Sequence, residues 1–165
     1  MARQRTPLPP PAVFEYLVPG SPASAHPRSE RQRRKNSKLN MWRSEVRAAI
    51  RKAIEEAVGP RKYELYIDPM RVQIIWFTAD LAAKNAPDLD NIAKPLLDEL
   101  EGLVIAEDRL FHEVHLRKVE VNHQFELEPW RVFEAKAGSL TEFVYVRVEP
   151  LEWDVPTRLR RSTEC

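Results

Sequence analysis

Two aspartates separated by one residue stand between an apolar run and a helical pattern. In the segment 87–91 (Pro-Asp-Leu-Asp-Asn), Pro87 biases the preceding residue toward extended backbone, where residues two apart point the same way. We therefore expect Asp88 and Asp90 to project side by side while Leu89 points toward the core. Carboxylates this close repel each other unless a cation lies between them, and hard oxygen ligands suit Mg²⁺ or Mn²⁺. The alternatives are a surface turn for Asp88 and a helix cap for Asp90.

A lysine follows at helical spacing. Lys94 lies four residues after Asp90, one turn further along the helix that is expected here. Its ammonium can approach a phosphate held by the metal and offset the charge that builds on the phosphorus. The alternative is a surface ion pair with Asp98. Because proline removes a hydrogen bond inside a helix, we expect the regular helix to begin near Pro95.

A third carboxylate follows the short apolar run 103–105. Glu107 and Asp108 stand at the end of this extended piece. If Asp108 returns to Asp88 and Asp90, the three carboxylates supply enough charge for one or two cations. An acidic hairpin turn is the alternative for Glu107 and Asp108.

Apolar periodicity predicts the elements that must position these groups. Their order, β-α-β-α-β-β, predicts one α+β domain with a small mixed sheet covered by helices on one side, and it leaves the strand pairing open. The predicted elements are a strand over 13–18, a helix over 40–58 capped by Asn40, a strand over 70–78, a short helix that ends near 101, and strands over 110–121 and 140–149.

Proline content marks the ends of this domain. The chain has 165 residues and 14 prolines, of which seven lie in its first 27 residues and two in residues 150–165. We expect a disordered proline-rich arm over 1–11, one folded domain over 12–149 and a basic C-terminal tail over 150–165. Within the domain, residues 122–139 are expected to form a long hairpin connection.

Charge is unevenly distributed along the chain, although the net charge is only +1. From Arg28 to Lys52 there are ten Lys/Arg and two Glu, and from Ala86 to Asp108 there are seven acids and one Lys. A basic segment and an acidic pocket on one domain suit a protein that grips a polyanion and holds a cation. The alternative is two solvated faces that attract each other.

The cysteine count and the lengths of the apolar runs bear on the cellular compartment. Cys165 is the only cysteine, so the chain can build no disulfide framework or zinc site of its own, which suits a reducing cytoplasm. A possible secretion signal near the start is interrupted by Pro9, Pro10, Pro11 and Glu15. No stretch approaches the roughly 20 apolar residues of a membrane span. We expect a cytoplasmic protein without membrane contact.

The combined spacing is similar to that of a known family. The segment 87–102 (Pro-Asp-Leu-Asp-Asn-Ile-Ala-Lys-Pro-Leu-Leu-Asp-Glu-Leu-Glu-Gly), followed by 104–108 (Val-Ile-Ala-Glu-Asp), resembles the RusA-like Holliday junction resolvases. The segment 18–24 (Val-Pro-Gly-Ser-Pro-Ala-Ser) resembles the first strand and loop of that family. The resemblance covers roughly residues 13–121. It implies a RusA-like fold and a homodimeric endodeoxyribonuclease that uses Mg²⁺, with Mn²⁺ as a substitute.

The resemblance also assigns roles to residues. By position, Asp88, Asp90 and Asp108 are the metal carboxylates and Lys94 is the essential lysine. Glu107 stands where the family commonly has the first of two acids, usually Asp, and it is a further candidate ligand. The insertion over 122–139 and the basic tail depart from the family pattern.

The function that the resemblance implies is resolution of four-way DNA junctions by paired, symmetric nicks. Two alternatives stay open. One is a fork or flap nuclease of a phage or defence system, and the other is a non-catalytic DNA-binding protein whose acidic cluster is structural. The residues expected to grip the DNA backbone are Arg28, Arg31, Arg33, Arg34, Lys35, Lys38, Arg43 and Arg47.

Overall fold

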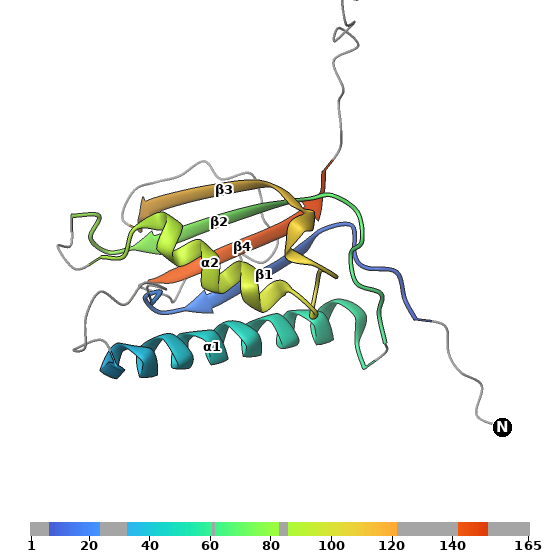
Figure 1. Ribbon diagram of the computed structural model, residues 1–165, viewed down its shortest axis with the longest axis horizontal. Helices are drawn as coiled ribbons and strands as arrows, with labels where there is room; N and C mark the ends of the chain where they lie inside the picture. Colours follow the sequence, from blue (N-terminus) through green and yellow to red (C-terminus); the bar gives the residue numbers. More distant parts are fainter. Residues whose placement is uncertain (1–6, 24–32, 61, 83–85, 122–141, 152–165) are drawn as a thin grey trace, which may run out of the picture.

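The computed structural model describes residues 7–23, 33–60, 62–82, 86–121 and 142–151, and of residues 33–36 the backbone alone. Within these residues, one four-stranded sheet has two helices against one of its faces, which confirms the expected α+β class (Figure 1). In chain order the elements are β1 (Phe14–Pro19), α1 (Arg33–Val58), β2 (Met70–Thr78), α2 (Leu89–Leu100), the short 3₁₀ helix η2 (Asp108–Leu110), β3 (Phe111–Glu120) and β4 (Phe143–Pro150).

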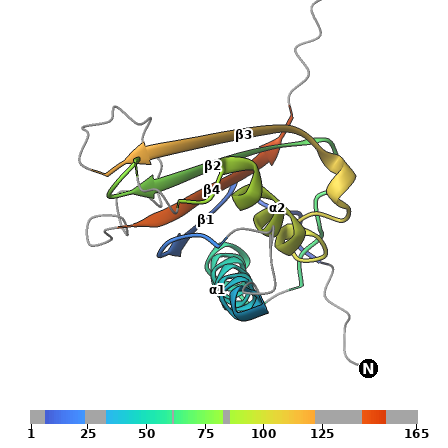
Figure 2. The same cartoon turned by 60° about the vertical axis from the view of Figure 1, so that its left-hand side comes forward.

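The strand order in the sheet is β1-β4-β2-β3. β4 is antiparallel to both β1 and β2, whereas β2 and β3 run parallel, with Thr78 opposite Glu120 at their common end. Parallel neighbours cannot be joined by a tight turn, so the chain must cross over a face of the sheet between them. α2 forms that crossover and runs back along the sheet from the end of β2 toward the start of β3 (Figure 2).

The main core lies between the sheet and the two helices. Side chains at steps of four on each helix face the sheet, and alternate side chains of β2 meet them. These buried residues are Trp42, Val46 and Ile50 on α1, Ile92, Leu96 and Leu100 on α2, and Val72, Ile74 and Trp76 on β2.

β2 is buried on its other face as well. Phe77 stacks on Phe143 of β4 with ring centroids 4.6 Å apart, and Ile75, Val119 and Tyr145 belong to the same buried cluster. Burial on both faces explains why β2 is a nearly continuous apolar run rather than an alternating one.

Further along that second face, a row of charged side chains crosses all four strands. Arg147 of β4 lies 3.4 Å from Glu15 of β1 and 2.8 Å from Glu149, and Arg71 of β2 lies 3.7 Å from Glu149 and 2.5 Å from Glu113 of β3. Each arginine thus lies between two carboxylates. The hydrogen bond from Arg71 holds the pKa of Glu113 below its usual range, so the carboxylate at the β3 end of the row stays ionised.

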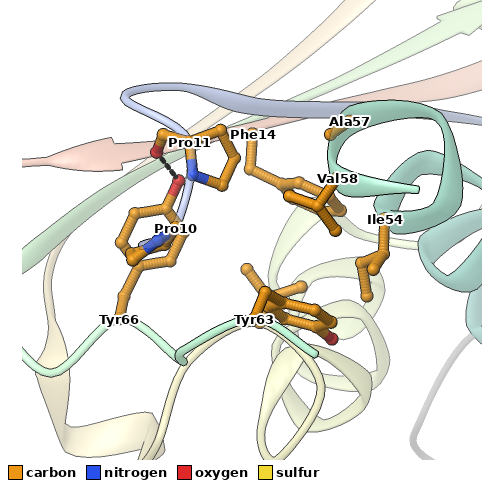
Figure 3. A pocket seen from close by; sticks show the side chains of 9 residues that line it. Pro10, Pro11, Phe14, Ile54, Ala57, Val58, Tyr63 and Tyr66 are labelled. Atoms are coloured by element: carbon orange, nitrogen blue, oxygen red, sulfur yellow. Dashed lines mark hydrogen bonds between the residues drawn. The ribbon is translucent and has the colours of Figure 1, made fainter. Parts of the chain in front are cut away.

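The segment before β1 packs on the domain from Pro7 onward. Leu8 forms a bridge with Tyr63, donating to the Lys62 carbonyl at 3.0 Å and accepting from Glu64 at 2.8 Å. The Tyr66 hydroxyl donates to the Pro11 carbonyl beside a small apolar pocket (Figure 3). Burial raises the pKa of Tyr66 to about 12, so its phenol keeps this proton at neutral pH. We expected residues 1–11 to be a disordered arm; residues 1–6 lie outside the described part, whereas 7–11 are held by these contacts.

Helix α1 begins seven residues before the expected start. The helix was predicted over 40–58 with Asn40 as its cap, but it runs from Arg33 and spans about 39 Å. The physical reason is that no Gly or Pro interrupts residues 33–58, and the basic residues and leucine before Asn40 are good helix formers. No described helix combines the length and apolarity that a membrane span needs.

The position of Asn40 inside α1 gives a test of this boundary. Asn40→Pro removes a helical hydrogen bond and clashes with the preceding turn, so it should lower the free energy of unfolding by about 3 kcal/mol. Asn40→Ala should be neutral or slightly stabilising, because Asn40 is exposed and alanine is the better helix former. Urea denaturation followed by circular dichroism measures both. If α1 instead began at residue 40, proline there would cost little.

Candidate active site at the start of α2

The first acidic pair lies at the N-terminus of α2. The helix begins at Leu89, with Asp88 in the cap position at φ −70° and ψ 151°. The Asp88 carbonyl accepts from the backbone nitrogens of Asn91 at 3.1 Å and Ile92 at 3.3 Å. The expectations of an extended Asp88–Asp90 segment, a cap at Asp90 and a regular helix from Pro95 are therefore wrong, because helical hydrogen bonding already begins at Asp88.

This geometry leaves both carboxylates available. Asp88 makes no side-chain capping bond, and both Asp88 and Asp90 are exposed. An aspartate at a helix N-cap ordinarily binds the backbone N–H groups of the first turn. Since Asp88 does not, its carboxylate can bind a cation and the N–H groups can bind an anion.

Asn91 adds an oxygen that sequence reasoning did not single out. Its Oδ1 is buried and has no hydrogen-bond partner in the described part of the chain. Pro95 has no N–H to donate to the Asn91 carbonyl four residues earlier. A buried polar oxygen without a partner costs about 1–3 kcal/mol, which a bound cation can offset. Asp88, Asp90 and Asn91 thus offer hard oxygen donors of the kind that Mg²⁺ prefers within four consecutive residues.

Lys94 lies one turn after Asp90 and is exposed. The alternative partner for Lys94 was Asp98, but Asp98 binds Arg43 of α1 at 2.5 Å instead. Lys94 makes no ion pair with any residue that the structure describes. Its ammonium is therefore available beside the acidic pair.

Glu107 and Asp108 follow the C-terminal end of α2, where Glu107 caps η2 and Asp108 begins it. The 12 residues of the helix separate the two acidic segments by about 18 Å of helical rise. Glu107 pairs with its neighbour Arg109, and Asp108 begins η2. Among the described residues, no group of three acidic, histidine or cysteine side chains could hold a metal ion. Asp108 thus does not return to Asp88 and Asp90 within one chain, because the crossover helix carries the chain away from them.

Two of the arginines expected to contact DNA, Arg43 and Arg47, bind acidic residues of α2 and hold α1 against it. Arg47 donates from Nε and Nη2 to Glu99 Oε2, both at 2.7 Å, and Arg43 binds Asp98. Glu99 is only 5% exposed, so these pairs compensate a buried charge. Burial, and to a lesser extent the Glu99 charge, raises the pKa of the adjacent Tyr16 well above its usual value.

Of the other residues expected to contact DNA, the structure describes only some side chains. Lys38 is exposed on α1. Arg33, Arg34 and Lys35 form the first turn of α1, with only their backbone described. Arg28 and Arg31, together with the connection over 122–139 and the tail from residue 152, lie outside the described residues.

Comparison with known protein families identifies a match. The family model for endodeoxyribonuclease RusA matches residues 19–127, about two thirds of the chain. The chain belongs to this endodeoxyribonuclease family, and the matched region contains α1, β2, α2 and β3 with both acidic segments. A comparison with curated proteins finds no match.

The contacts of Arg47 predict that its role is structural. Arg47→Met should lower the free energy of unfolding by ~2 kcal/mol, discounted from the buried-pair range because Arg47 is half exposed. Replacing both partners, Arg47→Met with Glu99→Leu, should restore most of the loss. Urea denaturation measures these changes.

Lys38, which is exposed on the same helix, is the matched comparison with Arg47 for DNA binding. Lys38→Met should reduce the slope of log affinity against log salt by about one, whereas Arg47→Met should leave that slope unchanged. Fluorescence anisotropy on duplex or junction DNA over a salt series measures both slopes. A reduced slope in the arginine variant, with unchanged stability, would contradict the assignment.

Proposed function

We propose that this chain is a Mg²⁺-dependent endodeoxyribonuclease that resolves four-way DNA junctions by paired, symmetric nicks. Membership in the RusA endodeoxyribonuclease family supports the nuclease class. The observation that carries the proposal is the first turn of α2, where Asp88, Asp90 and Asn91 offer oxygen donors and Lys94 follows one turn later.

The carboxylates of Asp88 and Asp90 would hold the cation, with Asn91 Oδ1 as a neutral oxygen donor. Bound Mg²⁺, or Mn²⁺ in its place, supplies Lewis acidity and a water of lowered pKa for in-line attack on a phosphodiester. The exposed position of both aspartates leaves their carboxylates accessible to a DNA strand. Asp108 and Glu107 are the further acids of the family pattern.

Lys94 and the start of α2 act on the phosphate. The N-terminus of a helix carries roughly half a positive charge, and its first N–H groups have no intrahelical partners. These groups can bind a non-bridging phosphate oxygen. The Lys94 ammonium offsets the negative charge that develops as the phosphorus becomes pentacoordinate.

The basic segment that includes the start of α1 would grip the DNA backbone. Lys38 is exposed there, and the backbone of Arg33, Arg34 and Lys35 forms the first helical turn. Binding through such residues depends on salt and selects shape rather than sequence. A homodimer with two-fold symmetry suits a junction, because two equivalent sites then meet two equivalent strands.

Loss of one carboxylate should abolish cleavage without abolishing binding. Asp90→Asn keeps the size of the side chain but removes the charge that holds the cation, so cleavage of a synthetic four-way junction in Mg²⁺ should fall by at least about 10²-fold. Gel shift in the presence of EDTA should give junction affinity close to that of the unmodified chain.

Asp98→Asn is the matched control for this change. Asp98 is an exposed aspartate on the same helix, two turns beyond Asp90, but it pairs with Arg43. Its loss should leave the cleavage rate within a few-fold. Equal cleavage by the Asp90 and Asp98 variants would rule out the site at the start of α2.

A further inference from the structure

We propose that Lys118 of β3 is a further DNA-binding residue of the candidate active site, where its ammonium holds a phosphate next to the one that is cleaved. This inference rests on the proposed function, because it concerns the same site and the same substrate. Its starting point is a lysine near the start of α2 whose ammonium contacts an aromatic ring and a neutral carbonyl. Sequence reasoning did not single out Lys118, since only its neighbours in space distinguish it from other lysines.

Lys118 lies on the helix-covered face of the sheet, near the end of β3. Its cross-strand partner is Trp76 of β2, and the two strands end two residues later, at Thr78 and Glu120. Leu116, two residues earlier on the same face of β3, packs against the main core. Lys118 therefore stands where the core gives way to solvent at this end of the sheet.

The start of α2 lies at the same end and on the same face of the sheet. The chain leaves β2 at Thr78 and enters α2 at Leu89, with Asp88 in the cap position. α2 contacts β3, and its first turn lies beside the ends of β2 and β3 (Figure 1). Ile92, on the sheet side of that turn, belongs to the same buried cluster as Trp76. Lys118 and the acidic pair thus share one end of the helix-covered face.

The side chain of Lys118 is held in place by two contacts. Its Nζ lies 4.4 Å from the centroid of the Trp76 ring and donates to the Leu81 carbonyl at 3.5 Å. Trp76 is fixed in turn, because its indole Nε1 donates to Glu142 at 3.1 Å. The face of the ring attracts the ammonium and the carbonyl accepts from it. The position of the positive charge is therefore set before DNA binds, which lowers the entropy that binding costs.

The charge of Lys118 lacks a counter-charge in the described part of the chain. Neither of its contacts is anionic, and it forms no ion pair with a described carboxylate, Asp88 and Asp90 included. Lys118 is half-buried, whereas the other lysines with described side chains are exposed, namely Lys38, Lys52, Lys62 and Lys94. A half-buried ammonium that only neutral groups contact favours an anion as its ligand.

A backbone phosphate of the bound strand is the anion that this position can meet. A DNA strand whose scissile phosphate lies at Asp88 and Asp90 carries further phosphates on either side of it. Lys94 projects from the helix one turn after Asp90, whereas Lys118 comes from the sheet, so the two ammonium groups can bind different phosphates. Contacts to such phosphates position the strand without reading its sequence. Lys118 therefore contributes to binding, while Lys94 acts on the bond that is cleaved.

Removal of the charge at Lys118 should weaken binding and spare cleavage. Lys118→Met keeps an unbranched apolar side chain over the Trp76 ring. Its junction affinity, measured by fluorescence anisotropy in EDTA, should fall on the order of ten-fold, and the slope of log affinity against log salt should decrease by about one. At saturating junction in Mg²⁺ the cleavage rate should stay within a few-fold, so KM rises while kcat is nearly unchanged. Urea denaturation checks that the variant folds, and Lys118→Gln replaces it if methionine destabilises the chain.

Three further variants separate a phosphate contact from a structural role. Lys118→Arg keeps a positive charge over the Trp76 ring and should retain the salt slope and most of the affinity. Lys94→Met should show the opposite split, with a large loss of kcat and little change in KM. Lys62→Met removes an exposed lysine whose carbonyl accepts from Leu8, in the segment that leads to the start of β2, and it should change neither quantity.

Single neutral phosphates identify the contact directly. Methylphosphonate groups replace one phosphate at a time around the branch point, in junctions that are bound in EDTA. For the unmodified chain, replacement of the phosphate that Lys118 holds should weaken binding on the order of ten-fold, because the neutral group no longer attracts the ammonium. The same replacement should have no further effect on Lys118→Met, while the effects at the other positions remain.

An unchanged salt slope in Lys118→Met, or an interference pattern identical to that of the unmodified chain, overturns the proposal. So does a Lys118→Arg variant that binds as weakly as Lys118→Met, because the role of the side chain is then structural. If the unmodified chain binds junctions without cutting them, the proposed function fails, and the interference pattern still decides whether Lys118 holds a phosphate. A chain that binds no DNA overturns both.

Discussion

The parallel pairing of β2 with β3 is the constraint on which the rest of the structure depends. Because parallel neighbours cannot be joined by a tight turn, the chain must leave the end of β2, cross one face of the sheet and return to the start of β3. That requirement fixes where α2 lies and in which direction it runs. It also places Asp88 and Asp90 at one end of the sheet and Asp108 at the other.

The position of α2 is secured by two kinds of contact with its surroundings. Ile92, Leu96 and Leu100 bury one side of the helix against the sheet, and the pairs of Arg43 and Arg47 with Asp98 and Glu99 hold it against α1. The remaining exposed stripe carries Asp90 and Lys94. The same packing that stabilises the helix therefore orients the polar groups that bear the proposed chemistry.

Local patterns in the sequence predicted much of this fold and less of the site. The apolar run of β2 and the alternation of β4 each indicated an element that the structure contains, whereas the Asp-Leu-Asp-Asn segment was expected to be extended and instead begins α2. Three features were not predicted, because they depend on contacts between residues that are distant in the sequence. They are the order of the strands, the ion pair between Arg47 and Glu99, and the separation of Asp108 from Asp90. The early start of α1 was missed for a local reason, since its first turns are basic and lack an apolar period.

The central claim is that the start of α2 serves a metal-dependent nuclease for branched DNA. Product mapping on an end-labelled four-way junction, with and without Mg²⁺, tests it most directly. The account predicts two nicks at symmetry-related positions in opposed strands, present with Mg²⁺ or Mn²⁺ and absent in EDTA, with fork and linear duplex cut far more slowly. Cleavage without a divalent metal, or equal cleavage of linear duplex, would contradict it.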